Sequence, residues 1–253
     1  MSVLVVTGGS RGIGAATARV AAASGWDVAV GYAENREAAA AVVREVEGLG
    51  RKAVAVQADV AREQDVERLF AEAESALGRI GGVVNNAGIS GNESRVADFR
   101  GEVLERLFAV NVIGLQLCCR EAVRRMSTRL GGEGGAIVNV SSMAATIGGR
   151  RGASDYAASK AAVDVFTVGL AKEVSAEGIR ANSLRPGMTM TDMTARLRDD
   201  AELRGRVEAT IPMKRIAEAD EVARPIVWLL SPEASFISGA CLDVSGGGFV
   251  VAG

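Results

Sequence analysis

The chain contains no histidine, and this absence removes several classes of catalytic site. A Ser-His-Asp triad and a metal centre with histidine ligands are both excluded. The acids and bases that remain are tyrosine, lysine, serine and the carboxylates. We therefore expect no metal site and a reaction that moves protons through these groups.

A surplus of basic charge is also missing. The net charge is −2, and no run of Lys or Arg offsets it, so we expect no nucleic-acid partner. No apolar stretch reaches the length of a membrane span without a charge. The first residues have no basic segment before a glycine-rich turn, so no signal peptide is predicted. We expect a cytoplasmic protein with no membrane partner.

Cysteine and proline are scarce. The three cysteines, Cys118, Cys119 and Cys241, form no CxxC pair and leave an odd number, which favours a reduced compartment and small core or interface residues. None of the four prolines precedes Pro186. We therefore expect no proline to interrupt the helices.

The 253 residues alternate short apolar β-branched runs with longer helical segments. This alternation is typical of a parallel sheet covered on both faces. We predict strands over residues 3–6, 27–32, 53–57, 80–85, 136–140, 180–184 and 241–244, and helices over 13–24, 36–49, 63–77, 103–129, 156–176 and 220–230. The expected fold class is α/β, a single-domain Rossmann doubly wound parallel sheet of about seven strands over residues 1–253.

Residues 188–213 depart from the alternation and are rich in Met, Thr and paired charges. Two short helices over the mouth of a site would suit this segment, and such lids often gate a substrate. A connecting pair of surface helices is the alternative.

A glycine turn follows the first predicted strand. Gly8, Gly12 and Gly14 permit a tight turn and a close approach of the backbone to a pyrophosphate at a helix N-terminus. The spacing G-x-x-x-G-x-G differs from the Walker loop, because no Gly-Lys-Ser/Thr follows. A plain turn between strand and helix is the alternative, but the position after the first strand favours dinucleotide binding.

The end of the second strand bears on which dinucleotide binds. An acidic residue there would favour NAD, and Glu34 lies slightly beyond the strand. Arg11 and Arg36 could instead meet a 2′-phosphate. We favour NADP(H), with NAD(H) as the alternative.

Tyr156 and Lys160 lie one helical turn apart, so both project from the same helix face. An ammonium beside a phenol favours the phenolate and lowers its pKa toward the working range. The pair suits proton transfer at a carbonyl or alcohol oxygen. An amphipathic face without chemistry is the alternative for the spacing alone.

Together the segments Thr7–Gly14, Asn85–Gly88 and Tyr156-x-x-x-Lys160 resemble the short-chain dehydrogenase/reductase family over essentially the whole chain. Asn111, Ser142, Pro186–Gly187 and the tail Ser238–Gly247 follow in the family's order. The resemblance implies that Tyr156 is the general acid in carbonyl reduction and that Lys160 lowers its pKa and holds the nicotinamide ribose.

The same resemblance implies that Ser142 orients the substrate oxygen and that Asn111 holds a water that relays protons. A kink or a satisfied core amide is the alternative for Asn111. Ser141 and Ser142 are adjacent on a strand, so only one can face the substrate. The residues expected to bind the cofactor are Gly8, Ser10, Arg11, Gly12, Ile13, Gly14, Tyr32, Arg36, Asp59, Val60, Asn86, Ala87, Gly88, Tyr156, Lys160, Pro186, Gly187, Thr189 and Thr191.

The substrate is expected to be a small alcohol or ketone, as in family members that act as sugar dehydrogenases or 3-oxoacyl carrier-protein reductases. Arg150 and Arg151 could attract an anionic substrate or be solvated loop residues. Met188, Met190 and Met193 could form an adaptable wall or pack the lid onto the body.

The family also implies a homotetramer, to which we assign the apolar Cys118–Cys119 pair and residues 249–252 as surplus apolar surface. A noncatalytic dinucleotide-binding sensor on the same scaffold is the alternative to an enzyme. The full set of Asn111, Ser142, Tyr156 and Lys160 argues for the enzyme.

Overall fold

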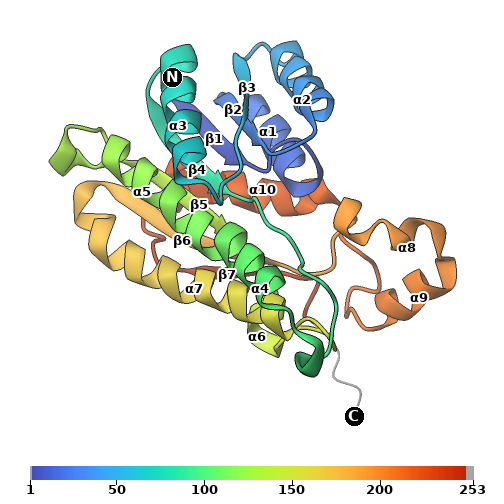
Figure 1. Ribbon diagram of the computed structural model, residues 1–253. Helices are drawn as coiled ribbons and strands as arrows, with labels where there is room; N and C mark the ends of the chain where they lie inside the picture. The colour runs from blue at the N-terminus through green and yellow to red at the C-terminus, as the bar shows by residue number, and fades with distance from the viewer. Residues whose placement is uncertain (1, 249–253) are drawn as a thin grey trace.

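A central parallel sheet organises the protein in the computed structural model, which describes residues 2–248 (Figure 1). The strand order is β3-β2-β1-β4-β5-β6-β7, and every pair is parallel. The strands are β1 (Val3–Thr7), β2 (Asp27–Tyr32), β3 (Ala53–Gln57), β4 (Ile80–Asn85), β5 (Gly135–Val140), β6 (Ile179–Pro186) and β7 (Cys241–Val244). The predicted seven-stranded doubly wound sheet is confirmed. The order reverses between β1 and β4, where ligands bind in open α/β sheets.

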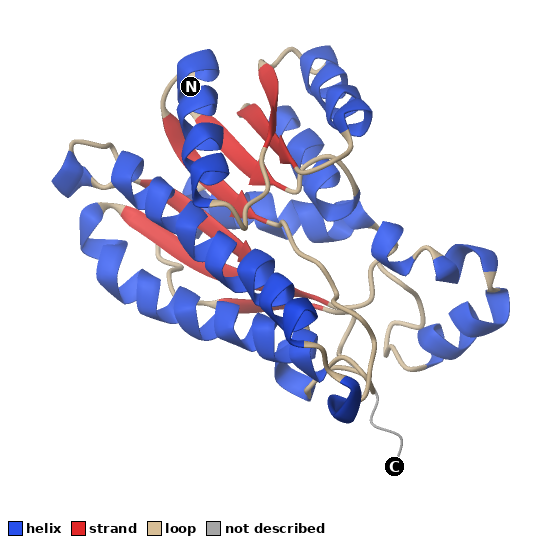
Figure 2. Ribbon diagram, viewed as in Figure 1, coloured by secondary structure: helices blue, strands red, loops and turns tan. Residues whose placement is uncertain are grey.

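Helices cover both faces of this sheet (Figure 2). They are α1 (Gly12–Ala23), α2 (Arg36–Gly48), α3 (Glu63–Leu77), α4 (Gly101–Phe108), α5 (Leu115–Met126), α6 (Ala144–Ile147), α7 (Ser154–Val174), α8 (Arg196–Asp199), α9 (Ala201–Ala209) and α10 (Ala219–Leu230). Helices α3, α5 and α7 pack on one face, and α1, α2 and α10 on the other. Pro225 lies inside α10, so the expectation of helices free of proline was wrong there. Within residues 2–248, none of the helices has the length and apolar character that crossing a bilayer requires.

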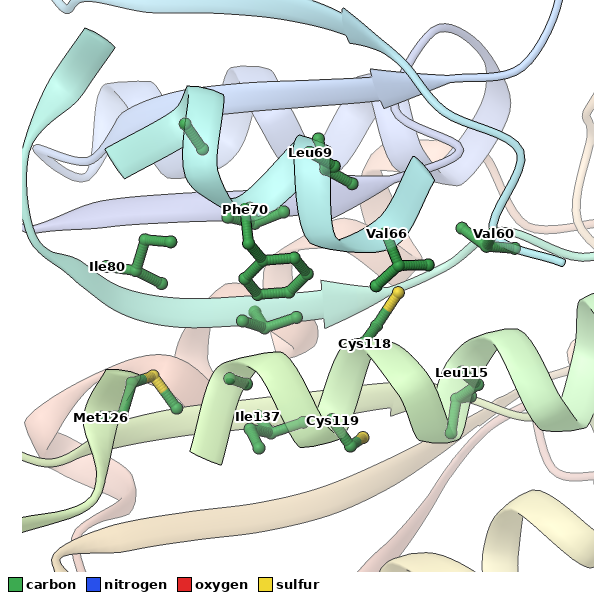
Figure 3. Packing of buried hydrophobic residues seen from close by; sticks show 14 of the residues in the cluster. Val60, Val66, Leu69, Phe70, Ile80, Leu115, Cys118, Cys119, Met126 and Ile137 are labelled. Carbon is green, nitrogen blue, oxygen red and sulfur yellow. The ribbon is translucent and has the colours of Figure 1, made fainter. Parts of the chain in front are cut away.

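Burial on both faces explains why the strands read as continuous apolar runs. All five residues of β1 are buried. On the α3–α5 face, the Phe70 ring from α3 lies over β4, and Cys118 and Cys119 from α5 belong to the same buried cluster (Figure 3). Both thiols are almost fully buried. They are therefore core residues, and the expectation that they form surplus apolar surface was wrong; the apolar residues 249–252 lie outside the described part of the chain.

The predicted single helix over residues 103–129 is divided. Helix α4 passes into a π-helical segment, Ala109–Gly114, and then into α5, which ends at Met126. Gly114 at the end of this segment packs closely against a distant loop, because a Cβ there would lie 2.6 Å from the Val60 carbonyl oxygen. π-Helical turns commonly occur at functional sites, and this one contains Asn111.

The segment that follows β6 forms the two short helices α8 and α9, as expected, and they project from the body (Figure 1). A small separate core holds them, formed by Leu197, Ile211 and Ile216. Met188 and Met190 pack against this core, whereas Met193 is exposed. Two of the three methionines therefore pack the segment onto itself, and its role as a lid stays a prediction.

Candidate active site

The glycine loop lies at the carboxyl end of β1, at the reversal of strand order. Gly8 and Gly12 have φ angles of 61° and 53°, which favour glycine. A Cβ on Gly14 would lie 2.2 Å from the Gly8 carbonyl oxygen. Arg11 precedes α1 and provides no side-chain cap for it. The first-turn N–H groups of α1 thus form a ready anion site that fits a dinucleotide pyrophosphate.

The segment after β4 is tied to this loop by hydrogen bonds. The Asn86 side chain donates to the carbonyl oxygens of Thr7 and Gly8 at 3.1 and 2.9 Å. The backbone N–H groups of Asn86 and Ala87 both donate to the Thr7 hydroxyl at 3.1 Å. Two segments predicted to contact the cofactor therefore form one rigid unit.

Tyr156 lies in the first turn of α7, with the Lys160 ammonium 5.9 Å from the centre of its ring. The Lys160 side chain is buried and donates to the Val140 carbonyl oxygen at 2.9 Å. Burial lowers the pKa of Lys160 to about 8, although the Asp164 carboxylate opposes this change. The pair is therefore placed together, as predicted.

The pKa of Tyr156 moves in the direction opposite to our expectation. Burial raises the phenol pKa above its usual value, and only a hydrogen bond with Ser142 opposes that change. The expectation that Lys160 lowers this pKa was therefore wrong for this structure. The phenol is therefore protonated at neutral pH, as a proton donor in the reductive direction must be, although a raised pKa makes it a weaker acid.

The two adjacent serines after β5 have different partners. Ser142 meets the phenol of Tyr156 and also accepts a hydrogen bond from the Ala144 N–H at 3.1 Å. Ser141 is buried and donates to the Lys160 carbonyl oxygen at 3.0 Å. Ser142 is thus the serine beside Tyr156, and Ser141 anchors α7.

Asn111 is fully buried, and its amide is fully engaged. It accepts from the Ile89 N–H at 2.9 Å and donates to the Ile89 carbonyl and the Ser159 hydroxyl at 2.9 and 3.1 Å. A Cβ on Gly88 would lie 3.4 Å from both the Asn111 Oδ1 and the Lys160 Nζ. Asn111 therefore borders the proton-transfer pair as a satisfied amide, and the water that it would hold stays a prediction.

The residues expected around the adenosine end are less closely grouped. Asp59 pairs with Arg106 at 2.9 Å and accepts from the Ala61 N–H at 3.1 Å. Tyr32 is buried at the end of β2, whereas Arg36 is exposed at the start of α2. Glu34 is exposed beside it. The structure does not bring Arg36 into contact with the glycine loop.

The segment after β6 approaches the glycine loop from the lid side. A Cβ on Gly12 would lie 3.3 Å from Thr191, and Arg11 lies 3.9 Å from the Asp192 carboxylate. The Thr189 hydroxyl donates to the Gly187 carbonyl oxygen at 3.1 Å. The strand end at Pro186 thus leads directly to the predicted cofactor site.

The arginines near the predicted mouth differ in their partners. Arg150 is exposed and forms an ion pair with Glu93. Arg151 is also exposed, and no ion pair involves it within residues 2–248. This arrangement fits solvated loop residues.

Sequence reasoning missed the polar cluster behind Lys160. Asp164 lies one further turn along α7, is buried, and accepts from Ser183 and Arg185 at 2.9 and 2.7 Å. The signal was available, because Asp164 repeats the four-residue step from Tyr156 to Lys160. Spacing alone could not predict that Asp164 meets Ser183 and Arg185 of β6.

Comparisons with known proteins agree with this geometry. Residues 8–248 match the protein family described as Enoyl-(Acyl carrier protein) reductase. The chain is 45% identical to the uncharacterized oxidoreductase YgfF of Escherichia coli K12, over 98% of this chain and 100% of that protein. It is 38% identical to an L-rhamnose 1-dehydrogenase (NAD(P)(+)) of a Sphingomonas species, over 98% and 96% of the two chains.

A solved structure is also similar. It is a short-chain dehydrogenase from Burkholderia cenocepacia J2315 in complex with NADP, with a TM-score of 0.90, 37% identity, and coverage of 98% of this chain and 97% of that chain. Because the relatives named as enzymes are oxidoreductases, the comparisons do not favour the alternative of a noncatalytic dinucleotide-binding sensor. The chain belongs to the short-chain dehydrogenase/reductase family of oxidoreductases.

Proposed function

We propose that the protein interconverts an alcohol and a carbonyl compound with NADP(H), and that Tyr156 is the general acid and base. The observation that carries this proposal is the position of the Lys160 ammonium, 5.9 Å from the centre of the Tyr156 ring, with Ser142 at the adjoining strand end acting on the Tyr156 phenol. All three residues lie at the carboxyl end of the sheet. Ligands bind at this end in open α/β folds.

A bound nicotinamide dinucleotide would supply or accept the hydride, and the glycine loop with the N-terminus of α1 would hold its pyrophosphate. Tyr156 then donates its proton to the carbonyl oxygen in reduction and removes it from the alcohol in oxidation. Ser142 donates a hydrogen bond to the same oxygen. Lys160, with its ammonium 5.9 Å from the centre of the Tyr156 ring, would hold the nicotinamide ribose.

The preference for NADP(H) is supported by charge near the loop. Arg11 is exposed beside the glycine turn, and a guanidinium recognises phosphate well. The Burkholderia relative is a complex with NADP. We expect tighter binding of NADPH than of NADH in a fluorescence titration, and the reverse order would assign Glu34 as the residue that decides.

The expected substrate is a small polyol or ketone. A hollow of about 640 Å³ lies beside the site, lined by Met143, Met213 and residues 243–248. Met143 follows Ser142 directly, so a substrate in this hollow would lie near the catalytic serine. Because a relative bears the name L-rhamnose 1-dehydrogenase, sugars are the first class to test, followed by ketones and acyl thioesters.

The Tyr156→Phe variant tests the proposal. Removal of the hydroxyl leaves the ring packing in place, so cofactor binding stays near normal while turnover falls by about 10²–10⁴-fold. Tyr32→Phe controls for the loss of a phenol hydroxyl, since the chain has only two tyrosines; because Tyr32 is itself expected to bind the cofactor, its turnover is compared at saturating cofactor, where it should be kept. Near-normal turnover in Tyr156→Phe would remove Tyr156 from the mechanism.

A further inference from the structure

A buried carboxylate lies directly behind the proton-transfer pair. Asp164 is 6% exposed and follows Lys160 by one turn of α7. Its Oδ1 accepts from the Ser183 hydroxyl at 2.9 Å, and its Oδ2 accepts from the Arg185 Nε at 2.7 Å. Carboxylates buried to this degree are usually paired with a positively charged group.

The strand geometry explains how the partners meet. Ser183 and Arg185 lie two residues apart on β6, so both side chains point to the same face of the sheet. Arg185 is opposite Asp243 of β7 in the register, and its Nη1 lies 3.2 Å from the Asp243 carboxylate. The guanidinium therefore shares its charge between a buried and a half-exposed carboxylate.

Lys160 has few other charged neighbours. The elements α6, β5 and the π-helical segment pack on α7 and contain no charged residue. On α4, Glu102 and Glu105 are exposed and Arg106 pairs with Asp59. Of the other packed elements, Glu177 in the 3-10 helix after α7 pairs with Arg129, and Arg180 of β6 donates to the Leu229 and Ser231 carbonyl oxygens. The groups placed beside Lys160 or Asp164 are Tyr156, Arg185 and, beyond Arg185, Asp243 and Cys241.

Asp164 is accordingly the carboxylate that favours the charged form of Lys160. Arg185 binds the same carboxylate from β6, and its positive charge would act on the Lys160 ammonium with the sign opposite to that of Asp164. The two effects oppose each other in sign. If Asp164 and Arg185 served only to join α7 to β6, they would not shift the pKa of Lys160 in opposite directions.

We propose that Asp164 is a positioning residue that keeps the Lys160 ammonium charged beside Tyr156, and that Arg185 limits this effect. The catalytic meaning of the proposal rests on the proposed function. The effect on Lys160 does not, because it is a property of the protein alone and can be measured without turnover.

The experiment is a pH titration of the protein labelled with ¹³C at lysine Cε, followed by NMR. Lysine occurs only at positions 52, 160, 172 and 214, so the Lys160 resonance is assigned by its loss in Lys160→Met. We expect a Lys160 midpoint at about 8 in the parent protein. Asp164→Asn lowers this midpoint by about one pH unit, and Arg185→Gln raises it.

Asp243→Asn is the matched control, because it also removes a carboxylate from Arg185 but leaves Asp164 in place. Its side chain is half exposed, so the Lys160 midpoint moves little. If Asp164→Asn does not fold, Arg185→Gln decides: a higher midpoint supports the proposal. Equal midpoints in the variants, or shifts of the same sign in both, overturn it.

The pH dependence of activity then tests whether Asp164 and Arg185 also affect catalysis. The alkaline limb of kcat/KM against pH moves to lower pH in Asp164→Asn and to higher pH in Arg185→Gln, whereas loss of packing would only lower the whole profile. Inactivity of the parent protein toward every substrate would contradict the proposed function. The lysine titration would still test Asp164.

Discussion

At the scale of single residues, the buried charge of Lys160 destabilises the folded protein, although the proposed reaction needs this residue. Its pKa falls from 10.5 to about 8 because burial disfavours the charged ammonium. Below pH 8 the lysine is charged in both states, so the folded state bears a cost of roughly 3 kcal/mol. Between about pH 8 and 10.5 only the unfolded chain holds the proton, so the contribution of Lys160 to stability rises with pH.

We therefore predict that Lys160→Met stabilises the protein at pH 7 by up to about 3 kcal/mol while it removes activity. Urea unfolding at pH 7 and pH 10 measures this, and the gain should shrink at the higher pH. Lys172→Met is the control on the same helix, because Lys172 is exposed. A less stable Lys160→Met at pH 7 would show that the hydrogen bond to Val140 outweighs the cost of the charge.

Gly14 tests the glycine loop. A Cβ at this position would lie 2.2 Å from a backbone oxygen that cannot move freely, so Gly14→Ala should displace the loop. We expect cofactor binding to weaken by at least tenfold and the protein to be destabilised by about 1–3 kcal/mol. Gly48→Ala is the matched control, because nothing lies within 4 Å of its Cβ position at the end of α2. NADPH titration and thermal unfolding compare the two variants, and unchanged binding in Gly14→Ala would exclude a close approach of the cofactor.

The residues of the site differ in how far the sequence predicts them. Tyr156, Lys160 and the glycines follow from short spacings within one turn or one loop, so local geometry suffices. Asp164 and Arg185 meet only when α7 packs on β6, which no local pattern encodes. The direction of the Tyr156 pKa likewise depends on burial, which spacing alone does not give.

At the scale of elements, a buried carboxylate on α5 gathers three arginines of the same helix, two of which also pair with glutamates of α3. Glu121 has its carboxylate within 2.6, 2.8 and 3.1 Å of Arg125, Arg124 and Arg120. Burial alone would raise the pKa of Glu121, but the arginines lower it below its usual value. Because the folded pKa is lowered, this contribution to stability is present above the unfolded pKa and is lost as the pH falls through the folded pKa.

Glu121→Gln should therefore destabilise the protein by about 3 kcal/mol at pH 7, because three arginines lose their shared partner. The difference from the parent protein should narrow in acid, as measured by urea unfolding at pH 7 and pH 4. Glu133→Gln removes an exposed partner of Arg79 and should change stability by less than about 1 kcal/mol. Equal changes in the free energy of unfolding for the two variants would show that the burial of Glu121 does not strengthen its ion pairs.

The elements themselves follow from the sequence where the pattern is local. β-Branched runs between turn residues define the seven strands, and several predicted bounds agree with the structure to the residue. The prediction of one α-helix over residues 103–129 was wrong in its middle, where the structure has the π-helical segment and where Gly114 lies close to Val60 of a distant loop. Periodicity detects the helix but not a contact of this kind.

At the scale of the whole molecule, exposed apolar side chains favour self-association. Val165 on α7 is 75% exposed, and Ile113 in the neighbouring π-helical segment is 52% exposed. Phe236 is fully exposed after α10. On this basis we keep the homotetramer as a prediction, with these side chains as candidate interface residues.

Light scattering of the purified protein should give the mass of a tetramer. Val165→Arg places a charge on the α7 surface and should yield smaller species, whereas Leu49→Arg, at the exposed end of α2, should leave the mass unchanged. A monomeric parent protein would contradict the proposed assembly.

The π-helical segment around Asn111 makes one stretch of the chain sensitive to length as well as to side chains. A π turn holds one residue more than an α turn, so the loss of a single residue from Ala109–Gly114 would let the helix continue as regular α-helix. That deletion would swing Asn111 by about 100° relative to α5 and separate it from Ile89 and Ser159. In this stretch a one-residue deletion would leave an intact helix but displace a residue of the site, so the number of residues between Leu107 and Leu115 matters to the site as much as their identities do.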